Sequence, residues 1–210
     1  MQDVLVMKRE LRKRMRSLLR QVSPTELGQR SRDACQKLIN SALFQSATTV
    51  AAFYHMPSNE VETTELLRVC FDRGKQVFLP RIEVESAAGM IMLEAYSVQD
   101  VEGWPPNPMG IREPPTLFHE VPRREVFSMI ERHGQPLDLV VVPGLAFDAF
   151  GHRLGRGKGY YDTFLSKCDM LHRQYNLPSP RRVGLALSCQ MVSQVPVTAH
   201  DQGVEAVFHA

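Results

Sequence analysis

A basic, glycine-rich tract in the last third of the chain has residue types and spacing that suit an anion. Residues 153–159 read RLGRGKG, so three cations alternate with three glycines. Glycine accepts positive φ angles and lets a ligand approach the backbone, and N–H groups that precede a helix bind phosphate oxygens. We therefore expect an anion cradle whose cations are Arg153, Arg156 and Lys158 and whose glycines are Gly155, Gly157 and Gly159.

The flanking residues predict a strand before this loop and a helix after it. Residues 139–142 are LVVV, the pattern of a strand buried on both faces. Pro143 and Gly144 end the strand at the edge where open α/β sheets bind ligands. Tyr160, Tyr161 and Asp162 then begin a helix expected over residues 160–172.

Two familiar nucleotide motifs do not fit the loop. A Walker A loop requires a glycine and a hydroxyl residue where this chain has His152 and Gly159. A dinucleotide fingerprint begins at Gly155 but ends at Tyr160. Arginine–glycine tracts also bind RNA, although usually in disordered surroundings, so RNA binding is the weaker alternative.

Residues 4–20 are expected to form a basic amphipathic helix. One stripe is apolar and comprises Met7, Leu11, Met15, Leu18 and Val22. The cations elsewhere on it are Lys8, Arg9, Arg12, Lys13, Arg14, Arg16 and Arg20. Three interpretations stay open: a solvated face, a mitochondrial presequence, or cations that face an anionic ligand. The acidic Asp3 and Glu10 count against the presequence.

Composition narrows the class of protein. The 210 residues carry a net charge of +2, which argues against bulk nucleic-acid binding. The four scattered cysteines form no CxxC pair, as expected of a reducing compartment. No apolar run approaches the roughly 20 residues that span a bilayer. We expect a cytoplasmic monomer without membrane or nucleic-acid partners, with mitochondria as the alternative location.

Alternating strands and helices predict the fold. Ser23–Pro24–Thr25–Glu26 is a capping box that starts a helix, and Thr63 is expected to cap a helix that Gly74 ends. Strands are expected at 48–54, 76–79 (stopped by Pro80), 90–96, 183–187 and 204–208, a helix at 124–131, and an irregular wrap over the sheet edge at 97–122. Such β-α-β units imply a mainly parallel sheet. We predict a single three-layer α/β/α domain over residues 1–210, with helix 4–20 packed on it.

The loop and four other segments together resemble one family. RLGRGKGYYD follows a strand that ends VPGLAFD, and the chain also contains KRELR (8–12), FYHMPSNEVET (53–63), FLPR (78–81) and QVPVTAHD (194–201). This order of motifs resembles the 5-formyltetrahydrofolate cyclo-ligase family, also called methenyltetrahydrofolate synthetases, over nearly the whole chain. The resemblance implies MgATP-dependent conversion of 5-formyltetrahydrofolate into 5,10-methenyltetrahydrofolate, with ADP and phosphate released, in a three-layer α/β fold.

The resemblance also implies site residues, carried over position by position. Catalysis falls to Lys158 and Arg156, and Mg²⁺ binding to Asp162 and Asp201. The implied ATP site is Lys8, Arg9, Glu10, Leu11, Arg12, Arg153, Leu154, Gly155, Arg156, Gly157, Lys158, Gly159, Tyr160 and Tyr161. The implied folate site is Arg12, Met56, Glu60, Arg156, Gly157, Lys158, Gly159 and Tyr160.

Simpler roles compete for several of these residues. Asp162 also suits the first turn of a helix electrostatically, Met56 suits ordinary packing, and Tyr161 has the pattern of a core residue. Two other functions are alternatives: an ATP-independent α/β enzyme for a sugar phosphate or acyl-CoA, and an inactive binding relative. The first needs neither the Lys8/Arg12 pair nor Asp162.

Overall fold

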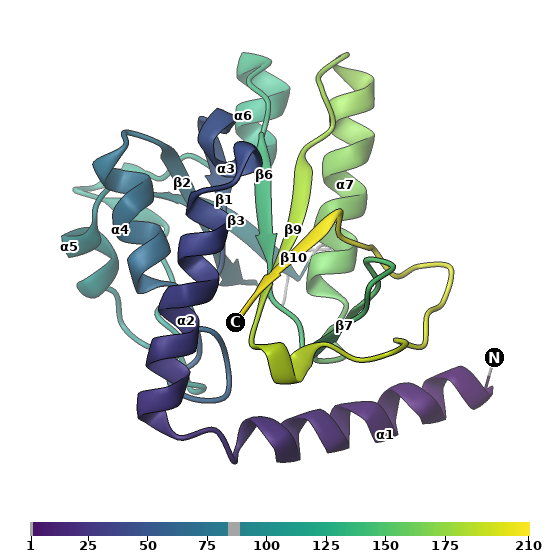
Figure 1. Cartoon of the computed structure of the whole chain (residues 1–210). Helices are drawn as coiled ribbons and strands as arrows, with labels where there is room; N and C mark the ends of the chain where they lie inside the picture. Colours follow the sequence, from purple (N-terminus) through teal and green to yellow (C-terminus); the bar gives the residue numbers. More distant parts are fainter. Residues whose placement is uncertain (1, 84–88) are drawn as a thin grey trace.

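The computed structural model describes residues 2–83 and 89–210, which build a six-stranded sheet (Figure 1). The strand order is β10 (Ala206–His209), β9 (Arg181–Ala186), β6 (Leu139–Val142), β1 (Thr49–Ala51), β2 (Gln76–Ile82) and β3 (Met90–Ala95). All neighbours pair in parallel except β3, which is antiparallel to β2. The predicted mainly parallel sheet is confirmed.

The central strand β6 shows why the sheet lies between two cores. Its four residues are fully buried, and their side chains alternate between faces. Leu139 and Val141 belong to one hydrophobic cluster, and Val140 and Val142 belong to the other. A strand with an apolar cluster on each side has no polar face, which explains its continuous apolar run.

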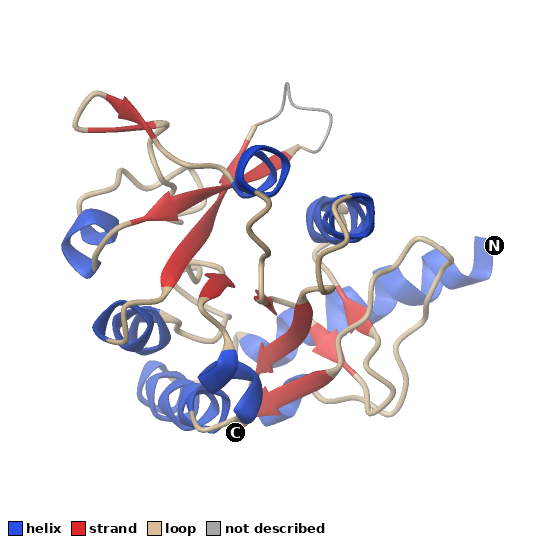
Figure 2. Cartoon of the chain, turned by 90° about the horizontal axis from the view of Figure 1, so that it is seen from above, coloured by secondary structure: helices blue, strands red, loops and turns tan. Residues whose placement is uncertain are grey.

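Helices cover both faces of the sheet (Figures 1 and 2). One layer holds α2 (Pro24–Ile39), α3 (Ala42–Ser46) and α4 (Thr64–Asp72), and the other holds α6 (Val126–His133) and α7 (Tyr160–Gln174). The expected three-layer α/β/α architecture is therefore confirmed. None of the described helices is long and apolar enough to cross a membrane.

The basic first helix, α1 (Gln2–Leu19), lies across the end of the other layers and extends beyond them in Figure 1. Its carboxyl-terminal half is anchored by Met15 and Leu19, which are buried in the core. Leu5 and Met7 near its amino terminus are more than half exposed. The helix predicted over residues 4–20 is confirmed, and only one side of it is packed.

Two helix caps behave differently from each other. Ser23 accepts a hydrogen bond from the Glu26 backbone N–H, as predicted. Thr63 occupies the cap position of α4, but its hydroxyl makes no cap bond and instead donates to the Phe53 carbonyl at 2.8 Å. The predicted capping role is wrong because this hydroxyl is fully buried beside a carbonyl that needs a partner. Gly74 ends α4 with φ +65°, as expected.

Pro80 does not end β2, contrary to prediction. The strand continues to Ile82, with Pro80 paired to Met92 of β3. On the other side, β1 pairs with β2 only as far as Phe78, whose carbonyl accepts from Ala52 N–H. In a strand, the backbone N–H and C=O groups of every second residue point to the same side. The backbone of Pro80 therefore points to the same side as that of Phe78, where β1 has already ended. The N–H that proline lacks would have no partner strand there, so no hydrogen bond of the sheet is lost.

The segment 97–122 is more regular than expected. It contains α5 (Val98–Glu102) and a hairpin of β4 (Leu117–Phe118) and β5 (Val121–Pro122). Buried Arg123 donates two hydrogen bonds to Asp100, which also accepts from Trp104 Nε1. Leu93 of β3 then bridges Glu125 in antiparallel fashion, so the residues directly after this segment pair with the β3 edge.

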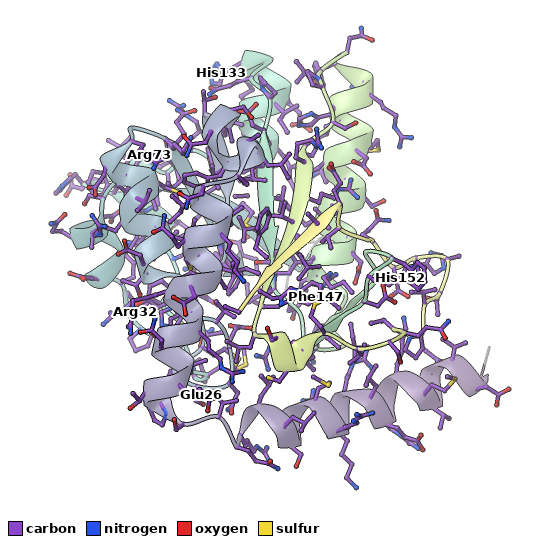
Figure 3. All side chains as sticks on the ribbon, in the orientation of Figure 1. Glu26, Arg32, Arg73, His133, Phe147 and His152 are labelled. Atoms are coloured by element: carbon purple, nitrogen blue, oxygen red, sulfur yellow. The ribbon has the colours of Figure 1, made fainter. Side chains whose placement is uncertain are left out.

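Other differences are small or concern short elements. The strand expected at 48–54 is only Thr49–Ala51, and the last two strands and α6 are shifted by about two residues. The hairpin of β7 (Ala146–Phe147) and β8 (Arg153–Leu154) and the short helix η1 (Ser188–Gln190) were not predicted. Asp148 holds this hairpin by accepting from the backbone of Phe150, His152 and Val195. Figure 3 shows Phe147 in the interior and His152 nearer the outside.

Thr63→Val tests the buried hydroxyl. The substitution keeps the side-chain shape but leaves the Phe53 carbonyl without its partner, so we expect a loss of about 1–3 kcal/mol in unfolding free energy. Thr64→Val is the control, because Thr64 is exposed, and it should change stability by less than about 0.5 kcal/mol. Equal urea midpoints for the two variants would contradict the assignment.

Candidate active site

A cavity of about 1460 Å³ opens at the carboxyl ends of β1, β2 and β6. The glycine loop, the start of α7 and one face of α1 line it, together with residues 53–60, 109–113 and 199–202. The strand ends gather at this edge because the strands are parallel. Segments far apart in the chain therefore meet around one space large enough for a ligand.

The glycine loop has two kinds of cation. Arg156 and Lys158 are exposed at the cavity. The side chain of Arg153 is 3% exposed, and it donates to Asp162 Oδ1 at 2.7 Å and to the Pro143 carbonyl at 3.2 Å. Two of the three loop cations are thus exposed at the cavity, and the third ties the loop to the residue after β6 and to α7.

The glycines meet two different requirements. Gly157 (φ +107°) and Gly159 (φ +74°, the residue that caps α7) have the predicted positive φ angles. Gly155 is not among the positive-φ glycines. A Cβ at Gly155 would lie 3.0 Å from Arg153 Nη1, so glycine is needed there for close packing.

Helix α1 brings two cations to the same loop. Lys8 is buried and its ammonium pairs with Asp201, and Arg12 Nε donates to the Gly155 carbonyl at 2.9 Å. Burial and the neighbouring Arg16 lower the pKa of Arg12. Residues four apart share a helix face, as Lys8 and Arg12 do here.

The rest of the KRELR segment lies away from the cavity. Arg9 and Glu10 are exposed, and Leu11 packs against the hydrophobic core; none of the three lines the cavity in the part of the chain described. Arg16, one turn after Arg12, does line it and donates to the Arg156 carbonyl at 3.4 Å. The sequence reasoning did not select Arg16, although its spacing from Lys8 and Arg12 was the available signal.

Two carboxylates, Asp162 and Asp201, lie close together in the cavity. Asp162 Oδ1 accepts from Arg153 and also, at 3.0 Å, from the backbone N–H of Gln202, the residue after Asp201. Asp201 Oδ2 accepts from Lys8 and from both N–H and hydroxyl of Thr198. Burial opposes ionisation of Asp201, but these hydrogen bonds prevail and lower its pKa.

The donor set suits a magnesium ion that a phosphate helps to hold. Every hydrogen bond to the two aspartates from a described residue falls on Asp162 Oδ1 or Asp201 Oδ2, which leaves one oxygen of each for a metal. Residues 2–83 and 89–210 contain no cluster of three or more acidic, histidine or cysteine ligands. Mg²⁺ accepts such a sparse set, because it binds one or two carboxylates together with phosphates and waters.

Glu60, on the segment after β1, lines the same cavity as these aspartates. Its side chain is 9% exposed. Oε2 accepts from the Met56 N–H at 2.9 Å, and Oε1 accepts from Arg156 Nη2 at 3.0 Å. Met56 and Tyr160 also line the cavity. The structure thus brings together the predicted nucleotide, folate and metal residues except Arg9, Glu10 and Leu11 of α1.

The proline-rich segment adds a wall that sequence reasoning did not assign. Met109, Ile111 and Glu113 line the cavity. Asn107 fixes their loop: its side chain accepts from the N–H groups of Met109 and Ile111 and donates to Glu113. The sequence analysis predicted that this segment wraps over the sheet edge, but it did not assign its residues to the cavity.

Fold and cavity together place the chain among open α/β proteins with a cation-lined site at the carboxyl edge of the sheet, where such folds bind small molecules. Residues 4–210 match the model of the 5-formyltetrahydrofolate cyclo-ligase family. The chain belongs to this family.

Individual relatives agree with this placement over nearly the full chain. The 5-formyltetrahydrofolate cyclo-ligase of Mus musculus is 34% identical, with 96% of this chain and 93% of the mouse protein covered. That of Escherichia coli K12 is 28% identical, with 92% and 94% covered. The solution structure of Aquifex aeolicus 5,10-methenyltetrahydrofolate synthetase matches with a TM-score of 0.69 and 26% identity, covering 97% of this chain and 89% of that one.

Neutralising each loop cation separately tests their different environments. Arg153→Met removes the cation that pairs with Asp162. We expect the free energy of unfolding to fall by about 3 kcal/mol, the lower end of the range for buried ion pairs, because Asp162 is partly exposed. Lys158→Met, at an exposed position, should change stability by less than about 0.5 kcal/mol. Urea unfolding measures both, and an Arg153→Met variant as stable as Lys158→Met would show that the ion pair holds nothing in place.

Proposed function

We propose that this protein converts 5-formyltetrahydrofolate into 5,10-methenyltetrahydrofolate and cleaves ATP to ADP and phosphate, with the formyl oxygen leaving in the phosphate, in a Mg²⁺-dependent reaction. The observation that carries the proposal is the convergence of Lys8, Arg12, the glycine loop, Glu60 and the two aspartates on one cavity. Family membership supports the folate substrate. The cations and carboxylates of the cavity support a polyphosphate with its metal.

The chemistry explains why a nucleotide is needed. The formyl carbon is a poor electrophile because nitrogen donates into its carbonyl, and oxide is not a leaving group. Transfer of the γ-phosphoryl group to the formyl oxygen breaks the bond to ADP and forms a phosphorylated iminium-like carbon. The amine at position 10 of the folate then attacks that carbon, loses its proton, and phosphate departs with the C–O bond electrons to give the methenyl cation.

Phosphoryl transfer depends on positioning the reactants and neutralising their negative charge more than on covalent catalysis, and the cations of the cavity suit both tasks. Arg156 offers a planar fork and Lys158 a compact charge, and both are exposed to the cavity. The N–H groups around Gly157 and Gly159 precede α7, whose positive end favours phosphate. Lys8 and Arg12 add charge from α1 for the same nucleotide.

Asp162 and Asp201 would hold Mg²⁺ through the oxygens that other residues leave free. When bound, the ion neutralises phosphate charge and aligns the β- and γ-phosphates. The hydrogen bonds from Arg153, Gln202 and Thr198 fix the orientation of the two carboxylates. These contacts keep the metal ligands in place without adding further negative charge.

Glu60 suits the amino-pyrimidine edge of the folate, because a carboxylate accepts two N–H donors side by side. In this structure the same carboxylate accepts from Arg156. Phosphate and carboxylate therefore compete for Arg156, and nucleotide binding that draws Arg156 away releases an oxygen of Glu60 for the folate. Met56 and Tyr160 supply apolar contact beside it.

Turnover by the purified protein is the direct test. With MgATP and 5-formyltetrahydrofolate, we expect methenyltetrahydrofolate, followed by its absorbance, and ADP in equal amounts. Chelation of Mg²⁺ should abolish both products. Absence of folate-dependent ADP release across a range of pH and divalent metals would refute the proposed reaction.

Lys158→Ala and Asp162→Ala test the site residues. Each removes one group that stabilises the transferring phosphoryl or its metal, so we expect kcat/KM to fall by about 10²-fold or more with the circular-dichroism spectrum retained. Lys13→Ala is the matched control, since Lys13 is exposed and does not line the cavity among the residues described. Full activity of Asp162→Ala would rule out its metal role.

A further inference from the structure

Lys167 is a cation of the cavity wall that takes no part in the charge pairs described above. It lines the cavity from α7 and is partly exposed. Its ammonium lies 4.1 Å from the centre of the Phe127 ring on α6, the helix beside α7 (Figures 1 and 2). Within residues 2–83 and 89–210 this ammonium makes no ion pair and no hydrogen bond. An aromatic ring thus holds a charge that can still bind an anion from the cavity.

The nearby acid Glu125 does not neutralise Lys167 through an ion pair. Its Oε2 accepts from the Ser128 N–H at 2.8 Å and so caps α6. Burial raises the pKa of Glu125, and the charge of Lys167 only opposes this shift. In the part of the chain described, a carboxylate from a ligand therefore has no ion pair of Lys167 to displace.

The direction of Lys167 on α7 separates it from the metal ligands. An α-helix turns by about 100° per residue, so Lys167 projects about 140° around α7 from Asp162. Arg173, which also lines the cavity, projects within about 20° of Asp162. Lys167 instead shares its side of α7 with Tyr160, two turns earlier. Of these two cations, Lys167 is the one directed away from the magnesium site that we propose.

An apolar part of the cavity wall lies on this side of α7. The residues of β2 and β3 that line the cavity are all uncharged, namely Pro80, Ile82 and Met90. Ile82 and Met90 pack in the hydrophobic cluster that includes Phe127. The Tyr160 ring packs against Gly89, where a Cβ would lie 2.7 Å from it. Lys167 follows Tyr160 by about 10 Å along the helix. This part of the wall therefore has an aromatic ring at one end and a cation at the other.

We propose that Lys167 binds a carboxylate of the glutamate group of the folate. The inference rests on the proposed function, since it assigns a further contact for the same substrate. A folate is a pterin joined through an aminobenzoyl group to glutamate. With its pterin near Glu60 and Tyr160, its aminobenzoyl ring would lie along the apolar wall and its carboxylates would reach Lys167. The ammonium supplies three donors, and a carboxylate accepts them in charge-assisted hydrogen bonds.

Lys167→Met tests the contact with two ligands that differ only in the charge of the glutamate group. The ligands are 5-formyltetrahydrofolate and its dimethyl ester, in which both carboxylates are esterified. Methionine keeps an unbranched side chain over Phe127, so the circular-dichroism spectrum should be retained. By calorimetry we expect the Kd of the acid to rise five- to thirtyfold and that of the ester to change less than twofold.

Two further variants serve as matched controls. Lys167→Arg keeps the charge and should bind the acid within about threefold of the wild type. Arg173→Met removes a cation from the other side of the same helix and should change neither Kd more than twofold.

Three outcomes overturn the inference. An unchanged Kd of the acid in Lys167→Met removes the contact, and an equal loss of affinity for acid and ester shows that Lys167 only shapes the wall. A selective loss for the acid in Arg173→Met transfers the contact to that residue. Wild-type turnover is measured in parallel: its absence refutes the proposed reaction, whereas turnover with equal affinity for acid and ester refutes this contact alone.

Discussion

Pairing of opposite charges is the constraint on which the cavity depends. Lys8, Arg153 and Arg156 each face one carboxylate: Asp201, Asp162 and Glu60. An unpaired charge in a partly buried site is costly, and removal of one partner leaves the other uncompensated. The three pairs therefore determine how α1, the glycine loop, α7 and the segment after β1 sit around a common space. The charges that we propose to recognise the ligand also hold the site together.

The sheet provides the fixed edge against which these pairs form. Phe147 packs so closely on Gly144 and Gly184 that a Cβ at either glycine would lie 2.6 Å from its ring. Gly144 comes after β6 and Pro143, and it lines the cavity. The close packing of Phe147 in the core therefore includes a residue of the cavity wall. Because the core is densely packed, it restricts movement of the cavity wall at this point.

Local patterns predicted those features that depend on neighbours in sequence. The apolar run of β6, the cap at Ser23 and the glycines before α7 were all recognisable because strand burial, capping and positive φ have local signatures. Long-range contacts decided the failures. Whether Pro80 ends a strand depends on how far β1 extends beside it, and Thr63 uses its hydroxyl for Phe53 rather than for its own helix.

The site residues also divide into those predicted from local motifs and those whose role depends on long-range contacts. Lys8, Arg12, Glu60 and Asp201 were named from their motifs, and the cavity unites them. Residue type alone could not distinguish the buried Arg153 from the exposed Arg156 in the same loop. Their burial differs because Arg153 lies on the β7–β8 hairpin. Nor could it select Arg16, whose role depends on which side of α1 faces the loop.

The contact between Lys8 and Asp201 spans 193 positions of the chain. A contact between residues so distant in sequence stabilises the protein only when the intervening chain is ordered, because the entropy cost of closing that loop precedes the gain from the contact. We therefore expect the sheet and its helices to assemble before this pair forms, so that a chain with its secondary structure in place can still lack a complete cavity. Ligand binding is thus a stricter measure of correct folding in this protein than its content of helix and strand.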